Sequence, residues 1–387
     1  MERISIAAAF VLGCVACSSS GNGGVDATVG TVDAPTVPSI DAATAGSCAP
    51  GSYATSISAS GDMTCTTFDE ATAVAVRSRC SVYLGQRDSC GGCSDAPTKW
   101  SKSDPLGCTP GTGAGNTCVS ATLDDPATPV QLATLDLDGD VNDDDKLYAG
   151  LHCITAARPL APAPCAPGWA ITGRRNNAWW CAPISEAAVN YVRSRCAVYL
   201  GWNDSCDGCT SPPTKWGHAN DVECVNGAGA NDTCTTATLA GETVKLFGLN
   251  TGGDVDGNDK FHIGLSCDTT PSSGDSTTGQ CPDGKFVIGT DVDGTIKCGD
   301  PSQIFADYLA NHCSLFFGWR DSCDACTTAP AKWGKVSIAS CANGIGADDT
   351  CTAMTLGAAT VQMFGLSPDG DVNNDDTFYV GFRCDAP

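Results

Sequence analysis

The chain has 387 residues, 44 of them acidic and 21 basic, and its formal net charge at pH 7 is −23. Nucleic acid and anionic membrane surfaces repel such a chain, so neither is expected as a partner, whereas solubility and cation binding are favoured. No apolar run approaches the ~20 residues of a transmembrane helix, so contact with a membrane is expected only through a lipid anchor at the N-terminus.

The N-terminal segment, residues 1–17, is typical of an export signal. An uncharged stretch from Ile4 to Gly13 has the length of the apolar region of a signal peptide. The segment resembles a bacterial lipoprotein signal, since Val11-Leu12-Gly13-Cys14 fits the lipobox pattern, and Cys17 is a second candidate for lipidation. The resemblance implies a lipid-anchored protein of the bacterial outer membrane or cell surface. An ordinary cleaved signal, which would leave a secreted protein, is the alternative.

Residues 18–47 are rich in Ser, Gly, Thr, Ala, Val and Asp and contain no aromatic or basic residue, which predicts a flexible tether. Beyond the tether, a set of eight cysteines occurs three times, in residues 48–153, 165–267 and 281–384. From the second cysteine to the seventh, the steps are 15, 10, 3, 15 and 10 residues in every copy. We therefore predict three homologous modules, numbered 1 to 3 along the chain.

The even number of cysteines in each module, behind an export signal, predicts a disulfide framework of an oxidising compartment. The first two cysteines of each module bracket a predicted hairpin, so local bridges are expected between Cys48 and Cys65, Cys165 and Cys181, and Cys281 and Cys298. The expected fold class is mainly β and disulfide-rich, with three tandem homologous modules. Each module is expected to have an opening β-hairpin, one short helix and several strands.

The first elements of each module follow in the same order. In module 3 the hairpin strands are expected at residues 286–288 and 295–297, around an Asp293-Gly294 turn. A residue that favours helix N-caps stands eleven residues before the third cysteine of each module. These residues are Asp69, Ser185 and Ser302. The apolar strand that follows the helix is expected to end at a glycine, which is Gly85, Gly201 or Gly318.

The Cys-x-x-Cys pairs have three interpretations; they are Cys90/Cys93, Cys206/Cys209 and Cys323/Cys326. A redox-active dithiol needs its first thiol at a helix N-terminus, and the Ser-Pro-Pro sequence at residues 211–213 continues no helix. A zinc site could be formed by Cys206, Cys209, Cys224 and Cys234. Outside the cytoplasm, two disulfides are the more common use of such a set.

An acidic loop near the end of each module alternates Asp and Asn, which places several hard oxygen ligands in a short turn and suits calcium. The loop of module 2 resembles the first half of a dockerin or EF-hand loop, but Asp259 replaces the usual glycine and Leu265 the closing acid. The resemblance implies weak calcium binding, and a solvated polar turn is the alternative. The candidate ligands are Asp138, Asp140, Asn142, Asp145, Asp254, Asp256, Asn258, Asp259, Asp369, Asp371, Asn373 and Asp376.

Aromatic residues add less to the functional interpretation. The tryptophan after a lysine in each module is interpreted as a core residue; these are Trp100, Trp216 and Trp333. Gln86 in module 1 replaces Trp202 and Trp319, so an exposed position is expected there. The four histidines occupy different module positions, which argues against a repeated histidine site.

The sequence therefore favours a non-catalytic surface lipoprotein whose three modules act in binding or adhesion, assisted by calcium as a weakly bound cofactor. The ligand is expected to be a surface glycan or protein, which three weak sites on one chain would bind with avidity. A purely structural envelope protein without a specific ligand is one alternative. An unrecognised secreted enzyme is the other, and it would need a polar cluster found in one module only.

Overall fold

The chain divides into two units, Met1–Asp41 and Ala42–Pro387. The computed structural model describes residues 46–49, 52–58, 60–68, 70–90, 92–123, 129–156, 159–176, 178–206, 209–269, 274–276, 279–281, 285–291, 293–299, 302–322 and 327–385. The lipidation candidates Cys14 and Cys17 lie outside these residues, as does the tether up to residue 45. None of the described helices is long and apolar enough to cross a bilayer.

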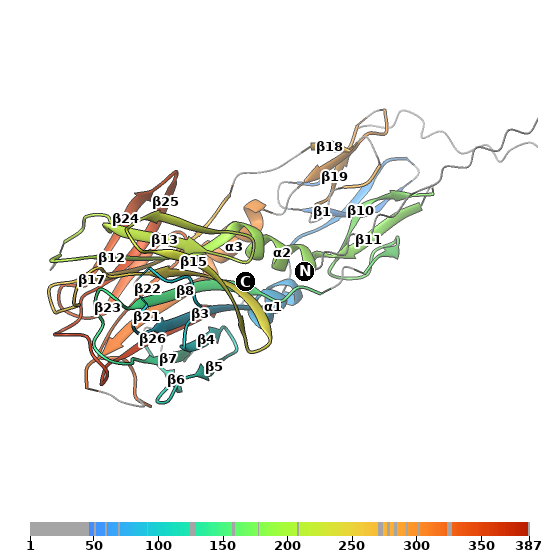
Figure 1. Ribbon diagram of the computed structural model, residues 1–387. Helices are drawn as coiled ribbons and strands as arrows, with labels where there is room; N and C mark the ends of the chain where they lie inside the picture. The colour runs from blue at the N-terminus through green and yellow to red at the C-terminus, as the bar shows by residue number, and fades with distance from the viewer. Residues whose placement is uncertain are drawn as a thin grey trace, which may run out of the picture. The chain divides into compact units, whose positions relative to one another are not determined.

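The fold is mainly β and rich in disulfides, and the same elements recur in each module, which confirms the predicted fold class (Figure 1). Each module opens with a small sheet. In module 1 it consists of β1 (Tyr53–Ile57) and β2 (Met63–Thr66), and in module 2 of β9 (Ala161–Pro162), β10 (Trp169–Arg175) and β11 (Ala178–Pro183). In module 3 it consists of β18 (Gly274–Ser276), β19 (Phe286–Thr290) and β20 (Ile296–Gly299). One helix follows in each module: α1 (Glu70–Arg79), α2 (Ile184–Arg195) and α3 (Ser302–His312).

Three six-stranded antiparallel sheets contain the remaining strands. Sheet 1 has the order β15 (Thr233–Leu239), β16 (Glu242–Leu249), β8 (Lys146–Cys153), β3 (Cys80–Arg87), β4 (Lys99–Asp104) and β5 (Gly107–Thr112). Sheet 2 has the order β14 (Cys224–Ala228), β13 (Lys215–Ala219), β12 (Cys196–Asn203), β17 (Lys260–Cys267), β25 (Ala359–Leu366) and β24 (Thr350–Leu356). Sheet 3 has the order β23 (Cys341–Ile345), β22 (Lys332–Val336), β21 (Cys313–Arg320), β26 (Thr377–Cys384), β7 (Val130–Asp136) and β6 (Cys118–Ala121).

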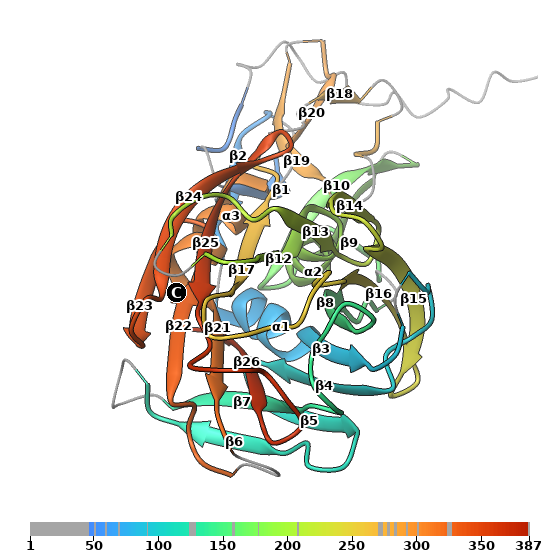
Figure 2. The same cartoon turned by 60° about the vertical axis from the view of Figure 1, so that its left-hand side comes forward.

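Each sheet takes four strands from one module and a two-stranded hairpin from another (Figure 2). Module 2 lends β15–β16 to sheet 1, module 3 lends β24–β25 to sheet 2, and module 1 lends β6–β7 to sheet 3. At the first of these seams, Phe247 of β16 pairs with Ala149 of β8. The exchange is cyclic, so the three modules of the sequence form one ring of sheets.

The opening hairpins are joined in the same cyclic order. The backbone N–H of Cys48 donates to the carbonyl of Ile288 at 2.8 Å, so module 1 is joined to module 3. Equivalent bonds run from Cys165 to Thr55 at 3.1 Å and from Cys281 to Thr172 at 2.7 Å. The apolar sides of the hairpins share a cluster that includes Ala54, Ile171 and Val287.

Disulfides fasten the ring of sheets at two kinds of position. Within each sheet, the strand after the helix is bonded to the last strand of its module by Cys80–Cys153, Cys196–Cys267 or Cys313–Cys384. Between sheets, an edge strand is bonded to a lent hairpin by Cys108–Cys118, Cys224–Cys234 or Cys341–Cys351. We call the second set the corner disulfides. They hold edge strands, which are prone to pair with other chains, beside an adjacent sheet.

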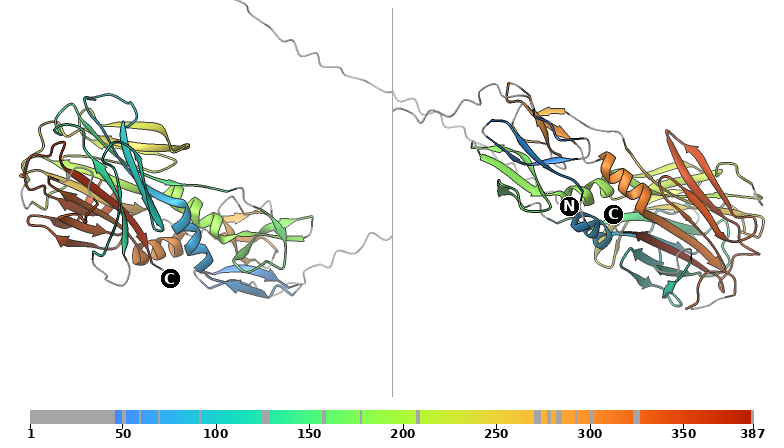
Figure 3. Two further views of the ribbon diagram at one scale, coloured as in Figure 1. Left: turned by 90° about the horizontal axis from the view of Figure 1, so that it is seen from below. Right: turned by 180° about the vertical axis from the view of Figure 1, so that it is seen from behind.

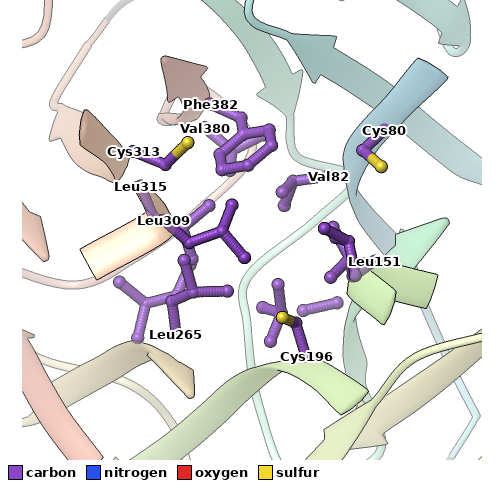
Figure 4. Close-up of a cluster of buried hydrophobic side chains, with 14 of the residues drawn as sticks. Cys80, Val82, Leu151, Cys196, Leu265, Leu309, Cys313, Leu315, Val380 and Phe382 are labelled. Atoms are coloured by element: carbon purple, nitrogen blue, oxygen red, sulfur yellow. The ribbon is translucent and has the colours of Figure 1, made fainter. Parts of the chain in front are cut away.

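The inner faces of the three sheets share one apolar core, in which side chains from all three point toward one another (Figure 4). Val82, Leu265 and Phe382, one from each sheet, are no more than 2% exposed. Leu309 of α3 reaches the same core, and the three helices lie together between the hairpins and the sheets (Figure 3). Burial of this core is the main favourable contribution to folding.

The glycines expected to end the first long strand lie inside it, so that prediction is wrong. Strand β12, for example, continues through Gly201 to Asn203. A Cβ at Gly201 would lie 2.8 Å from the Cβ of Pro213, and Gly85 and Gly318 have equivalent prolines at 2.9 and 2.8 Å. Glycine is needed here because the segment after the Cys-x-x-Cys pair packs directly on the strand.

Ser185 is not the N-cap of α2. The helix begins at Ile184, and its N-cap residue, Pro183, is also the last residue of β11. The backbone N–H of Ile184 donates instead to the carbonyl of Gly168 at 2.9 Å, so neighbouring backbone replaces a side-chain cap. Ser302 is the first residue of α3, and Asp69 lies outside the described residues.

The position of Gln86, Trp202 and Trp319 is buried, not exposed as expected, at 0%, 4% and 1% exposure. The strands continue past their glycines, and this residue then faces the shared core. The amide of Gln86 is satisfied by the backbone of Asp138: Nε2 donates to the Asp138 carbonyl at 3.1 Å, and Oε1 accepts the Asp138 N–H at 2.8 Å. A polar residue is therefore tolerated at this buried position.

Candidate functional site

The three acidic loops, which each connect a lent hairpin to the last strand of its own module, meet at the centre of the ring. The N–H of Val141 donates to the carbonyl of Val372 at 2.8 Å. Val372 donates to Val255, and Val255 donates to Val141, both at 2.9 Å. The valine side chains are buried, at 1–2% exposure. The ring thus brings together candidate residues from all three modules.

Taken over the three loops, eight of the twelve predicted calcium ligands accept hydrogen bonds from the backbone or pair with lysine. Asn142 Oδ1 accepts the N–H of Asp144 at 3.0 Å, and Asp256 and Asn373 form the same turn with Asn258 and Asp375 at 2.9 Å. Asp138 pairs with Lys99 at 2.9 Å and Asp369 with Lys332 at 2.6 Å. The remaining exposed carboxylates stand directly before the central valines; they are Asp140, Asp254 and Asp371.

The last aspartate of each loop is buried and bound to the loop backbone. Asp145 accepts the N–H of Ser89 at 3.0 Å and that of Asn142 at 3.1 Å. Asp259 and Asp376 accept the equivalent pairs of N–H groups. Burial raises the pKa of Asp145 to about 7 and that of Asp376 to about 6. These carboxyl groups therefore fasten the loop to the strand that ends beside it.

Among the described residues, one group of carboxylates could hold a cation. Oxygen atoms of Asp321, Asp375 and Asp376 all lie within 4.8 Å of one another. Only Asp376 belongs to the predicted ligand set; Asp375 is its exposed neighbour, and Asp321 directly follows β21. Oxygen ligands of this kind suit Ca²⁺. In module 2, Asn258 stands where module 3 has Asp375, so the charge of the group differs between modules.

In modules 1 and 2 the Cys-x-x-Cys segments are joined to the lent hairpins. Cys90–Cys93 and Cys206–Cys209 are disulfides, and Cys224–Cys234 is a corner disulfide, so the four cysteines considered for zinc form two bonds. The fully buried Lys146 crosses the seam, donating to Cys93 O at 2.6 Å and to Thr233 Oγ1 at 3.0 Å. Cys323 and Cys326 lie outside the described residues.

A polar cluster occurs at the seam inside sheet 1, where the module 1 strands meet the hairpin lent by module 2. We call it the seam network; it consists of Tyr83, Lys102, His152, Asp221 and Glu242. The Glu242 carboxylate accepts the Tyr83 hydroxyl, and Lys102 Nζ lies 3.0 Å from it. His152 lies between two acids, with Nδ1 bonded to Asp221 and Nε2 3.9 Å from Glu242. Asp221 Oδ2 also accepts the N–H of Cys153 at 2.8 Å.

The electrostatics of the seam network favour a structural role. Burial and the hydrogen bond to Glu242 raise the pKa of Tyr83 far above its usual value, so the phenol stays protonated as a donor. Burial works to raise the pKa of Glu242, but the bonds from Tyr83 and Lys102 outweigh it and leave that pKa below its usual value. The network is thus a set of satisfied pairs that joins two modules.

The seam network could not be found by comparing modules, because its members come from two of them. Ala359, the first residue of β25, stands where β16 has Glu242, so the second seam lacks this acid. The only signal in the sequence was that His152 does not repeat. Comparison with protein-family models, with curated proteins and with solved structures finds no match for the chain.

Proposed function

We propose that the chain is a non-catalytic lipoprotein of the bacterial outer membrane or cell surface that acts in binding or adhesion, with calcium as a weakly bound aid. The cyclic exchange of hairpins, with a disulfide at each corner, carries the proposal. A body held in this way presents its surface already ordered, which reduces the entropy lost on binding. The tether expected at residues 18–47 would hold this body away from an anchor at Cys14 or Cys17.

A binding screen of the whole mature chain tests the proposal. Because each sheet contains strands of two modules, the whole chain is the unit to assay. Retention by cells or by members of a glycan array supports a binding function. Mass spectrometry of the N-terminal peptide should show a lipid adduct, and replacing both Cys14 and Cys17 with Ser should release the protein into the soluble fraction. A chain without lipid that retains no cell or glycan overturns the proposal.

The structural alternative, an envelope protein without a specific ligand, is favoured by the same corner disulfides. The two are distinguished by the screen, since a purely structural protein retains no ligand. Among the residues that the structure describes, the candidate for the catalytic alternative is the seam network, a polar cluster found at one seam. Its groups are committed to one another, and Tyr83 is held as a hydrogen-bond donor. We therefore propose no reaction for it.

A further inference from the structure

One stretch of this acidic chain carries a net positive charge because it lacks acidic residues. Residues 146–185 contain no acidic residue and four basic ones, although the whole chain carries a net charge of −23. Two of the four, Arg174 and Arg175, are consecutive, and no other two basic residues in the sequence are adjacent. Both lie in the opening hairpin of module 2.

In the structure these arginines are the last two residues of β10, beside a tryptophan of β11. Arg174 pairs with Trp179 in the ladder, and its guanidinium carbon lies 5.7 Å from the centre of the indole ring. Arg175, the last residue of β10, is exposed. Trp179 packs on the hairpin cluster with part of its surface and leaves the rest accessible. A cationic and an aromatic surface therefore lie side by side.

The other two opening hairpins form without this surface. Between its first two cysteines, module 1 has Asp62 and no basic residue. Module 3 has two lysines and three aspartates there, and Lys297 pairs with Asp291 at 2.6 Å. The hairpin fold therefore does not require the arginines or the tryptophan, and among the described residues the buried Nε of Arg174 has no hydrogen-bond acceptor.

We propose that Arg174, Arg175 and Trp179 bind a carboxylate-bearing polysaccharide, an inference that rests on the proposed binding function and names its ligand class. Guanidinium groups pair with carboxylates through two parallel hydrogen bonds. The indole offers a rigid apolar face on which a sugar ring can pack. Electrostatic forces reach only ~8–10 Å at moderate salt, so a single polysaccharide strand bound here interacts with this local surface alone. An extended anionic membrane would also face the acidic residues of the rest of the protein and be repelled by them.

The test measures binding of the oxidised whole chain to immobilised polygalacturonate, with a chelator present so that calcium cannot bridge the two acidic partners. We expect the wild-type chain to bind, and R174Q/R175Q to weaken binding about tenfold or more, the loss expected for charged hydrogen bonds. W179L should also weaken binding, because it removes the aromatic face. K297Q on the matching hairpin of module 3 should bind as wild type does. Raising the salt from ~50 to ~300 mM should weaken wild-type binding.

Further measurements distinguish a lost binding site from an unfolded variant, and a wrong ligand from a wrong function. R175Q alone changes an exposed residue, and its melting temperature shows whether the fold is intact. The inference is overturned if folded R175Q and W179L both bind polygalacturonate as the wild-type chain does. It is also overturned if binding to phosphatidylglycerol vesicles requires these residues and binding to polygalacturonate does not. A wild-type chain that ignores polygalacturonate but is retained by cells or neutral glycans refutes this ligand and leaves the proposed function standing. A wild-type chain that binds neither polygalacturonate, nor cells, nor neutral glycans refutes both the ligand and the proposed function.

Discussion

At the scale of single residues, a buried carboxyl group near each of two seams makes stability depend on pH. Asp349 accepts the N–H of Ser367 at 2.9 Å through Oδ1, and burial raises its pKa to about 7. Asp232 makes the same bond to Asn250 at 2.7 Å, and burial raises its pKa to about 6. Module 1 has Asn116 at this position, and its Oδ1 accepts the N–H of Asp136 at 2.8 Å. Module 1 thus makes the same hydrogen bond with a side chain that does not titrate.

Asp349→Asn should flatten the pH dependence of unfolding. A raised pKa means that the folded state binds more protons than the unfolded state, so this stabilisation is full below about pH 4 and is lost as pH rises to about 7. Asparagine keeps the oxygen that accepts the Ser367 N–H but has no titrating carboxyl group. The slope of unfolding free energy against pH should therefore fall by up to about 1.4 kcal/mol per pH unit. Urea unfolding from pH 4 to 8 measures it. Asp371→Asn, at an exposed position, is the control, and equal slopes for wild type and Asp349→Asn contradict the prediction.

Gly201→Ala should destabilise the protein by about 1–3 kcal/mol, as overpacking does. The new methyl group would lie 2.8 Å from both Cβ and Cγ of Pro213, and the strand cannot move without disturbing its neighbours. Gly253→Ala is the matched control, because nothing lies within 4 Å of its Cβ position. Thermal unfolding measures both variants. Equal melting temperatures would show that the proline segment moves away at little cost.

At the scale of elements, the corner disulfides should control the lent hairpins. Replacing Cys224 and Cys234 with Ser should cost about 2–4 kcal/mol and speed amide hydrogen exchange in β15 and β16. Replacing Cys165 and Cys181 with Ser should instead speed exchange in β10 and β11, because that bond closes a single hairpin. Mass spectrometry of exchanged peptides distinguishes the two. Unchanged protection of β15 in the first variant would mean that strand pairing alone holds the hairpin.

Calcium should bind the acidic loops weakly and raise the melting temperature of the whole chain. With a Kd of ~10⁻⁴–10⁻³ M, a tenfold excess adds about 1.4 kcal/mol per site. Asp375→Asn, which gives module 3 the residue that module 2 has at Asn258, should reduce the gain by weakening the group with Asp321 and Asp376. Calorimetry with calcium, magnesium or chelator measures the effect. A melting temperature indifferent to calcium means that the loops are solvated turns held by their own hydrogen bonds.

At the scale of the whole molecule, sharing of strands should make the three modules unfold together. Phe247 is fully buried in the lent β16 yet packs in the core common to all three sheets. Heating should therefore give one calorimetric transition, and Phe247→Ala should shift all of it to lower temperature by removing some 3–5 kcal/mol. Three separable peaks, with only one moved by the substitution, would show that the modules are independent.

The cysteine spacing predicts the repeat, and turn and N-cap residues predict the opening hairpins and the helices, because these features depend on residues close in sequence. The lending of hairpins could not be predicted. Strands β16 and β25 have nearly the same apolar pattern, Glu242–Leu249 and Ala359–Leu366, so each suits its own sheet as well as a neighbouring one. The seam network was missed for the same reason, since His152 meets Glu242 only through the exchange. Choice of partner strand is a non-local property.

The disulfides inside each sheet also determine how the chain responds to mechanical force. Cys80–Cys153, Cys196–Cys267 and Cys313–Cys384 span 73, 71 and 71 residues. A force along the backbone passes through these bonds, so the enclosed strands, lent hairpins included, carry none of it directly. At roughly 3.4 Å per extended residue, about 24 nm of chain in each module cannot be drawn out. Under flow or shear the protein would lengthen only outside those bonds, in the helices and in the segments that connect the modules, until a reductant cut the bonds.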